Sequence, residues 1–541
     1  SAGLAAPPAA APAPDEPGSA PDNAARPGLH PALFAGYKTL AALRYDYPLV
    51  LLDNVADGAL VRPLSGIVDG VLQRIAPRGA AGEQLRKHVL LLEGKIRALV
   101  SGGVQGSLSA LWLRAAAELR SAASAASERS LAESLDSARA ALRLDGKIID
   151  CGGETPAAVL AHAFEATRKA KTRGFHDKAE MLARRLGDIL KADFMSSREG
   201  RSAENLKRAF GRFESSFDFD ALSDILTPSA ARASMPEARR RRIRDVLATL
   251  RAQRFFAASG RDGAGERAQE VYPFVFESCA AAVSAFRQRL PEMATLVKAL
   301  AIADLESANR YKESQHDPIF RRFDGAALAP EDLALFPPIL VCLRQGHYDA
   351  AEQAKIVDLL SSSLPIKILV QTDDLLAPSG IESGTSFPDA GGTRLARMAA
   401  GLHGAFVLQA ASSHLYRVSG SIAKGLAYPG PALFSVFSGV GQARRDLPPY
   451  LAAAAAVEAR AFPIFSRDPD AGPDRSWCFD IGANPQAERD WTRHHLTYED
   501  ENHQAVSEDV AFTFADFVAG DRRHAGRFAS VPRGAWRETL V

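Results

Sequence analysis

Polar side chains follow three apolar runs in the second half of the chain, where buried strands are expected to end. These residues are Arg344-Gln-Gly-His347, Thr372-Asp-Asp374 and Ser438-Gly-Val-Gly441. In open sheets of parallel strands, ligands bind beyond the carboxyl ends of the strands. The carboxylates, amide and hydroxyls of these segments could therefore hold a cation or a polar ligand. His347 could serve as a general base, although one histidine does not define such a site.

A second group of polar residues crowds a short stretch near the C-terminal end. Its members are His494, His495, Glu499, Asp500, Glu501 and His503. Histidines and carboxylates at such spacing could bind Zn²⁺ or Mn²⁺. The ordered HExxH spacing is absent, so the segment is predicted to be a solvated polar loop.

Four consecutive arginines, Arg239 to Arg242, could contact phosphate groups. On a helix they would spread around the cylinder, and Glu237 and Asp245 lie nearby in the sequence. An exposed charged surface is the prediction here.

Composition limits the classes of protein. The 541 residues suit two to four domains, and a net charge of +1 gives no general attraction to nucleic acid or anionic membranes. The four cysteines (Cys151, Cys279, Cys342 and Cys478) form no CxxC pair, so buried thiols in a reducing cytoplasm are expected. No apolar run approaches the roughly 18 residues of a membrane span.

The ends differ from the rest. Residues 1–29 are rich in Ala and Pro, which favours a stiff, extended linker, and they lack the pattern of a signal peptide. A linker joins two parts, so we expect the chain to belong to a longer multidomain protein. Residues 531–541 are interpreted as a tail.

The pattern of elements predicts an α/β protein with a mostly helical N-terminal half. Residues 30–140 have helical periodicity, and residues 141–334 do so too and could contain the start of, and an insertion in, the following domain. Residues 335–530 alternate strands and helices, which predicts a three-layer domain around a parallel sheet. The predicted strands are 337–343, 366–370, 405–409 and 432–437, and the predicted helices are 349–360, 394–402 and 415–427.

Five segments of this domain resemble, in order, the thiamine-diphosphate-binding C-terminal region of pyruvate:ferredoxin oxidoreductases. The clearest is Ala427-Tyr-Pro-Gly-Pro-Ala-Leu-Phe434, which is similar to the family's "YPGPSLI". The others are 337–346 (a strand ending in Gly-Asp-Gly), 365–380 ("DTEVYSNTGG"), 458–469 ("DTGYWPLYRFNP") and 514–525 ("FLMGEVRYA"). A sixth, Gly152–Pro156, resembles "GCGETP".

The resemblance implies a thiamine-diphosphate-binding-like domain and names its cofactor residues. They would be Gln345, Gly346, His347, Thr372, Asp373, Asp374, Ser379 and Gly380. The family's Gly-Asp-Gly carboxylate falls on Gln345, and two further ligands fall on Asp373 and Pro378. Asp373 is thus the candidate Mg²⁺ ligand in an altered site.

The resemblance also implies that the family's iron–sulfur cluster is absent from this chain. Two of the cysteines that hold it fall on Gly152 and Val440, with Cys151 one position away. Cluster ligation needs thiolates at closely defined positions.

We therefore expect a degenerate cofactor domain with a structural role in a larger cytoplasmic oxidoreductase. It would pack against neighbouring domains or subunits and form a homo-oligomer, with no nucleic acid and no membrane span. One alternative is an active 2-oxoacid oxidoreductase component that uses thiamine diphosphate and Mg²⁺ in a rebuilt site and needs a partner domain. Another is a binding module for a different ligand or a protein. The catalytic residues stay unknown.

Overall fold

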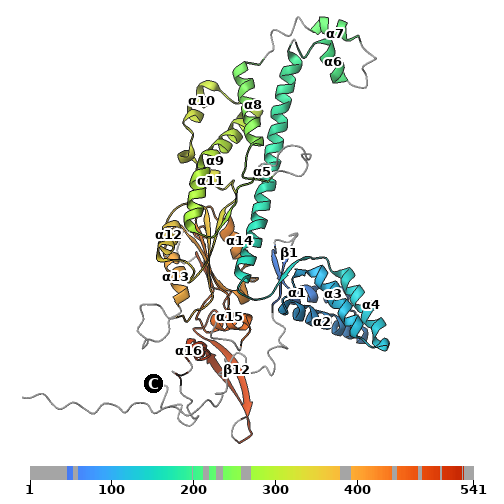
Figure 1. Ribbon diagram of the computed structural model, residues 1–541, viewed down its shortest axis with the longest axis vertical. Coiled ribbons are helices and arrows are strands. Elements are labelled where there is room, and N and C mark those ends of the chain that lie inside the picture. The colour runs from blue at the N-terminus through green and yellow to red at the C-terminus, as the bar shows by residue number, and fades with distance from the viewer. Residues whose placement is uncertain are drawn as a thin grey trace, which may run out of the picture.

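A computed structural model describes most of the chain between residues 46 and 528. The described residues are 46–52, 59–197, 199–210, 218–226, 235–257, 270–377, 391–441, 447–472, 478–499, 502–524, 526 and 528. The expected linker and tail lie outside them. The chain forms a small N-terminal unit, a seven-stranded sheet and a long helical arm (Figure 1).

The N-terminal unit combines four helices with a four-stranded antiparallel sheet in the order β2-β1-β4-β3. Its strands are β1 (Leu49–Leu52), β2 (Val61–Pro63), β3 (Gly106–Ser107) and β4 (Gly146–Ile149). Its helices are α1 (Leu64–Ile75), α2 (Ala80–Ser101), α3 (Leu108–Ala122) and α4 (Ala125–Ala141). The region 30–140 was predicted as helical only, so β1, β2 and β3 are a correction to that prediction.

Strand β1 joins this unit to the rest of the molecule. Val50 and Leu52 are buried in the core of the N-terminal unit, whereas Leu49 and Leu51 belong to the core of the larger sheet. Successive strand residues face opposite sides, so one short strand is buried on both faces. The hydroxyl of Tyr47 adds a buried hydrogen bond to the carbonyl oxygen of Ser412 at 2.7 Å.

The larger sheet has the strand order β11-β10-β8-β9-β7-β6-β5. Its strands are β5 (Val275–Phe276), β6 (Ile339–Arg344), β7 (Ile366–Thr372), β8 (Phe406–Ala411), β9 (Ala432–Phe437), β10 (Phe465–Arg467) and β11 (Phe479–Asp480). Strands β5 to β9 are parallel, and β10 and β11 extend the sheet antiparallel. The four predicted strands are confirmed, since long apolar runs suit strands covered on both faces.

Helices cover both faces of this sheet. The helices α12 (Ala350–Leu360) and α13 (Arg394–Ala400) lie on one side (Figure 1). The helix α14 (Ser419–Ala427) and the base of α5 (Thr155–Ser196) pack together on the other side. From β6 the chain moves through α12 to β7 and through α13 to β8, in one direction along the sheet, and α14 then brings it back to β9. Right-handed crossovers in opposite directions place their helices on opposite faces of the sheet. The α/β class is confirmed.

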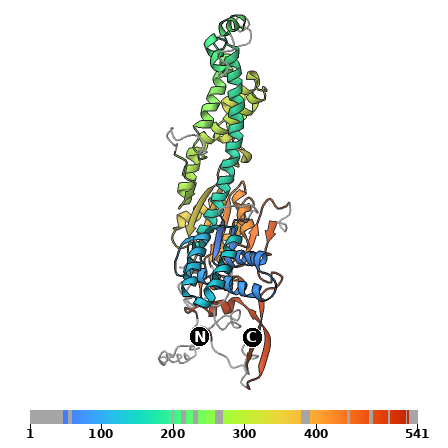
Figure 2. The same cartoon turned by 90° about the vertical axis from the view of Figure 1, so that its right-hand side faces the viewer.

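The arm rises from the sheet between residues 165 and 330 (Figures 1 and 2). It contains α5, α8 (Glu237–Arg251) and α9 (Cys279–Ser307), which pack on one another. The helices α6 (Ala203–Phe210) and α7 (Phe219–Leu226) lie at its far end, and α10 (Glu313–Arg322) and α11 (Pro330–Leu333) lead back to β6.

Arginines of α8 hold the arm together. Arg239 and Arg242 each pair at 2.8 Å with the carboxylate of Glu306 on α9, which is 2% exposed. Arg240 pairs with Asp193 of α5 at 2.8 Å. The expected exposed basic surface is therefore wrong for three of the four arginines. Because α8 lies against both α5 and α9, side chains spread around it meet carboxylates on each neighbour.

The C-terminal part adds α15 (Pro449–Glu458), α16 (Phe514–Ala519) and a hairpin of β12 (Thr492–Glu499) and β13 (Ala505–Phe512). The predicted polar loop at His494 and His495 is thus wrong, because these residues lie in β12. His494 contacts Glu458 at 3.3 Å and His495 contacts Asp509 at 3.1 Å. Within the described ranges, no group of three or more His, Cys, Asp or Glu side chains is placed to hold a metal ion.

The four cysteines are free thiols. Cys279 and Cys478 are buried, and burial raises the pKa of Cys279 to about 12. Among the described helices, none combines the length and apolar character needed to cross a membrane.

Candidate functional site

The carboxyl ends of β6, β7 and β9 bring polar side chains into one cluster. The hydroxyl of Thr372 donates to Gln345 Oε1 at 2.7 Å. Asp373 Oδ1 accepts hydrogen bonds from Gln371 Nε2 at 2.7 Å and from Ser438 Oγ at 2.6 Å. Three predicted site residues, Gln345, Thr372 and Asp373, therefore lie at the same edge of the sheet.

Strand register explains this convergence. Arg344 pairs with Gln371, and Thr372 pairs with Phe437, so the three strands end level. The ladder continues for one step, with Gln345 N donating to the carbonyl oxygen of Gln371 at 2.7 Å. Ser438 N likewise donates to the carbonyl oxygen of Thr372 at 3.0 Å. Main-chain pairing thus places the side chains within reach of one another.

The segment Gly152–Pro156, at the start of α5, also reaches this edge. The carbonyl oxygen of Gly153 accepts from Gln371 Nε2 at 2.7 Å and from the Arg344 guanidinium at 3.2 Å. The helix begins at Thr155, with Glu154 at the N-cap position and Pro156 in its first turn, so Thr155 does not cap the helix. The Thr155 hydroxyl instead donates to the carbonyl oxygen of Asp150 at 2.7 Å.

Asp374 is turned to a different partner. Its two carboxylate oxygens accept from the Arg523 guanidinium at 2.7 and 2.8 Å. Arg523 also bonds the buried Asp521 at 2.8 Å, and hydrogen bonds to the two carboxylates raise its pKa. The C-terminal segment 514–524 is therefore tied to the loop after β7.

The other predicted residues do not join the cluster. Gly346 has φ +84°, a left-handed conformation that favours glycine, and it forms the turn after β6. His347 is exposed, and none of the described residues makes a hydrogen bond to its ring. Ser379 and Gly380, with Pro378, lie outside the described residues.

The segment that begins at Ser438 was expected at a strand end, and Ser438 does join the cluster. Gln371 and the short helix η7 (Ser412–His414), which follows β8, also lie at this edge and were not predicted as site residues. Ser412 Oγ is buried without a hydrogen-bond partner among the described residues. Burial is the main reason that the pKa of His414 falls to about 4. A polar run directly after a predicted strand was the available signal for Ser412 to His414.

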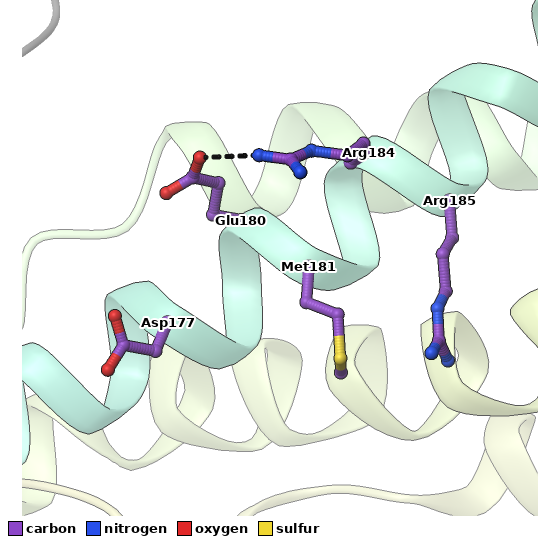
Figure 3. A pocket seen from close by; sticks show the side chains of 5 residues that line it. All are labelled: Asp177, Glu180, Met181, Arg184 and Arg185. Carbon is purple, nitrogen blue, oxygen red and sulfur yellow. Dashed lines mark hydrogen bonds and ion pairs between the residues drawn. The ribbon is translucent and has the colours of Figure 1, made fainter.

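A hollow of about 390 Å³ lies elsewhere, on α5 in the arm (Figure 3). Its lining residues are Asp177, Glu180, Met181, Arg184 and Arg185. They follow one face of the helix at helical spacing, and Glu180 pairs with Arg184 at 3.1 Å. Both of these side chains are largely exposed, so this hollow is an open helix surface.

The strand-end cluster offers one carboxylate, two amides and two hydroxyls, which suits the binding of polar groups. No protein-family model matches the chain. A search of curated proteins also finds no matching relative.

Proposed function

We propose that residues 336–530 are a thiamine-diphosphate-binding-like domain whose cofactor site is degenerate and whose role is structural. One observation carries the proposal: the polar side chains at the carboxyl edge bond to one another. Thr372 is bonded to Gln345, and Asp373 Oδ1 is shared by Gln371 and Ser438. Neutral side chains therefore donate hydrogen bonds to the amide and carboxylate oxygens that a cofactor site would direct at its ligand.

The donor set fits a Mg²⁺-diphosphate group poorly. Mg²⁺ requires near-octahedral oxygen ligands and usually at least one carboxylate. Gln345 contributes only a neutral amide, and its oxygen already accepts from Thr372. Asp374 is held by Arg523, which leaves Asp373 as the remaining carboxylate of this loop. We therefore derive no reaction step through thiamine diphosphate.

The positions of the resembling segments support the relationship. Gly152–Pro156, Arg344-Gln-Gly346 and Thr372-Asp-Asp374 meet at the carboxyl edge of the sheet. The segment 427–434 leads into β9, and 458–469 contains β10. Residues 514–524 reach the edge through Arg523. These contacts would be retained if the sheet and its loops had kept an older architecture after the charged ligands changed.

An active site with rebuilt metal ligation is the second candidate. It is favoured by Asp373 Oδ2, to which no hydrogen bond is made from the described part of the chain. This oxygen could bind a cation without breaking the bonds to Oδ1.

Isothermal titration with thiamine diphosphate, with and without Mg²⁺, separates the two candidates. The structural role predicts no Mg²⁺-dependent heat for the wild type or for Asp373→Asn. Micromolar binding that needs Mg²⁺ and is lost in Asp373→Asn would overturn it. Asp358→Asn, an equivalent change on the exposed side of α12, is the matched control.

A further inference from the structure

The hairpin of β12 and β13 forms a sheet of its own, with both outer edges unpaired by any strand that the structure describes. It extends away from the larger sheet in both views (Figures 1 and 2). Each strand contributes eight residues, paired from Thr492–Phe512 to Glu499–Ala505. Isolated two-stranded ribbons are marginally stable in water, and open edges readily pair with another strand.

One contact defines which main-chain groups face the outer edge of β12. Arg493 N donates to Gln486 Oε1 at 3.0 Å, and the carbonyl oxygen of Arg493 accepts from Gln486 Nε2 at 3.0 Å. Both groups of Arg493 therefore point away from β13. Because these directions alternate along a strand, His495, Thr497 and Glu499 also present their main-chain groups outward. Within the described residues, no main-chain group forms a hydrogen bond to the outward groups of His495, Thr497 and Glu499.

The sequence around these residues has a charge symmetry centred on Thr497. Arg493-His-His495 precedes Thr497, and Glu499-Asp-Glu501 follows it at the same distances. In an antiparallel pairing of two identical strands about Thr497, His495 lies opposite Glu499.

We propose that the β12 edges of two copies of this chain pair antiparallel about a two-fold axis at Thr497. The pairing would use the outward groups of His495 with Glu499 and of Thr497 with itself, with two hydrogen bonds in each pair. The result is a four-stranded sheet across the two copies, with β13 of each copy at the outside, and the two-fold axis limits the assembly to a dimer. The β13 edge suits this less well, since Glu508 and Asp509 at its middle would bring like charges together. The dimer does not depend on the cofactor proposal.

Sedimentation of the whole chain over a range of concentrations tests the proposal. An interface made by one strand edge from each copy buries less surface than a standard stable complex does. A weak, concentration-dependent dimer is therefore expected. Thr497→Pro removes an outward N–H and should abolish the dimer without removing a hydrogen bond of the hairpin ladder. Ser507→Pro is the matched control, because Ser507 lies opposite Thr497 and its N–H faces the other edge. Each variant loses the same 3.0 Å hydroxyl contact between these residues.

A charge change tests the register. Glu499→Lys puts a cation opposite His495 of the second copy and should weaken the dimer about tenfold or more. Glu488→Lys makes the same change on an exposed residue outside the strand and should leave dimerisation unchanged. A chain that stays monomeric at about 1 mM, where an association free energy of about −4 kcal/mol would be detected, overturns the proposal. So does a dimer that survives Thr497→Pro or is lost with Ser507→Pro.

Discussion

The parallel strands of the larger sheet have buried polar groups at both their amino ends (the amino edge) and their carboxyl ends (the carboxyl edge). The hydrogen bonds of these groups are made in different ways at the two edges. At the amino edge, two lysines bond main-chain carbonyls. Lys367 of β7 is fully buried and donates to the carbonyl oxygens of Tyr428 and Gly430 at 2.5 and 2.7 Å. Lys171 of α5 donates to those of Ala334 and Phe336 at 2.6 and 2.8 Å.

At the carboxyl edge, Asp373 and Thr372 bond neutral side chains. The two guanidinium groups at this edge are partly exposed: Arg344 bonds Gly153 and Glu154, and Arg523 bonds Asp374 and Asp521. The amino edge joins segments by single ammonium groups, of which that of Lys367 is fully buried and that of Lys171 half-buried. The carboxyl edge distributes its bonds over several short polar side chains.

This difference has a consequence for tolerance to mutation. Removing one lysine leaves two carbonyl groups without a donor, and neither can find water when the site is buried. Members of the carboxyl cluster share their hydrogen bonds, so removing one leaves neighbours with a second partner, as Gln371 keeps the carbonyl oxygen of Gly153. Stability should therefore depend more on the amino edge, and the carboxyl edge should be freer to change chemically.

The largest effect is expected for Lys367→Met. At about pH 10 or above, the variant should lose about 2 kcal/mol of unfolding free energy, because the carbonyls of Tyr428 and Gly430 lose their donor and a fully buried polar side chain is replaced. Urea denaturation measures this loss. Lys424→Met, on the exposed side of α14, should change stability by less than about 0.5 kcal/mol. Equal effects of the two variants would contradict the special role of the amino edge.

The second prediction concerns pH. Burial, with a smaller effect of the nearby Lys171 charge, lowers the pKa of Lys367 from 10.5 to about 7. Between these values the unfolded chain binds more protons than the folded one, so this group makes stability rise with pH from about 7 to about 10.5. One such group contributes a slope of at most about 1.4 kcal/mol per pH unit.

Lys367→Met removes this titration. The advantage of the wild type over the variant should therefore shrink as pH falls from about 10, and it should reverse in sign before about pH 7, because a slope of up to about 1.4 kcal/mol per pH unit sums over this range to more than about 2 kcal/mol. Urea titrations at several pH values measure it. A constant difference would show that Lys367 keeps an ordinary pKa in the folded protein.

Four strands of the larger sheet could be predicted because their sequences are continuous apolar runs, and 432–437 matches β9 at both ends. The strands β5, β10 and β11 were missed, since each has only two or three residues. The strands β1 and β2 were missed because they are short and stand beside long helical patterns. The hairpin was missed because its polar residues indicated a loop. An exposed ribbon buries too little surface to impose an apolar pattern.

The site could be predicted only to the level of strand ends. Parallel strands that end level bring Gln345, Thr372 and Asp373 together. Their hydrogen-bond partners depend on contacts that no local pattern encodes. Gln371 bonds Gly153, which lies 218 residues away in the chain. Asp374 bonds Arg523, which lies 149 residues away.

A third prediction compares two changes to the charged pair beside the carboxyl cluster. Asp374→Asn should cost about 1 kcal/mol or less, since both partners are partly exposed. Arg523→Gln should cost more, about 2 kcal/mol, because it also removes the guanidinium hydrogen bonds to the buried carboxylate of Asp521. Thermal or urea unfolding of both variants gives the order. The reverse order would mean that Asp521 is not the residue that needs the guanidinium.

The smallest effect is expected for Asp373→Asn, at about 0.5 kcal/mol. The amide oxygen of asparagine can still accept from Gln371 and Ser438, so the cluster keeps its bonds. Asp373→Ala should cost about 1 kcal/mol more, because the Ser438 hydroxyl and one N–H of Gln371 then lose their acceptor. If Asp373 binds a cation instead, Mg²⁺ will raise the unfolding temperature of the wild type and leave that of Asp373→Asn unchanged. Such a result would make the carboxyl edge a ligand-binding site, and of the two edges the amino edge alone would then have a structural role.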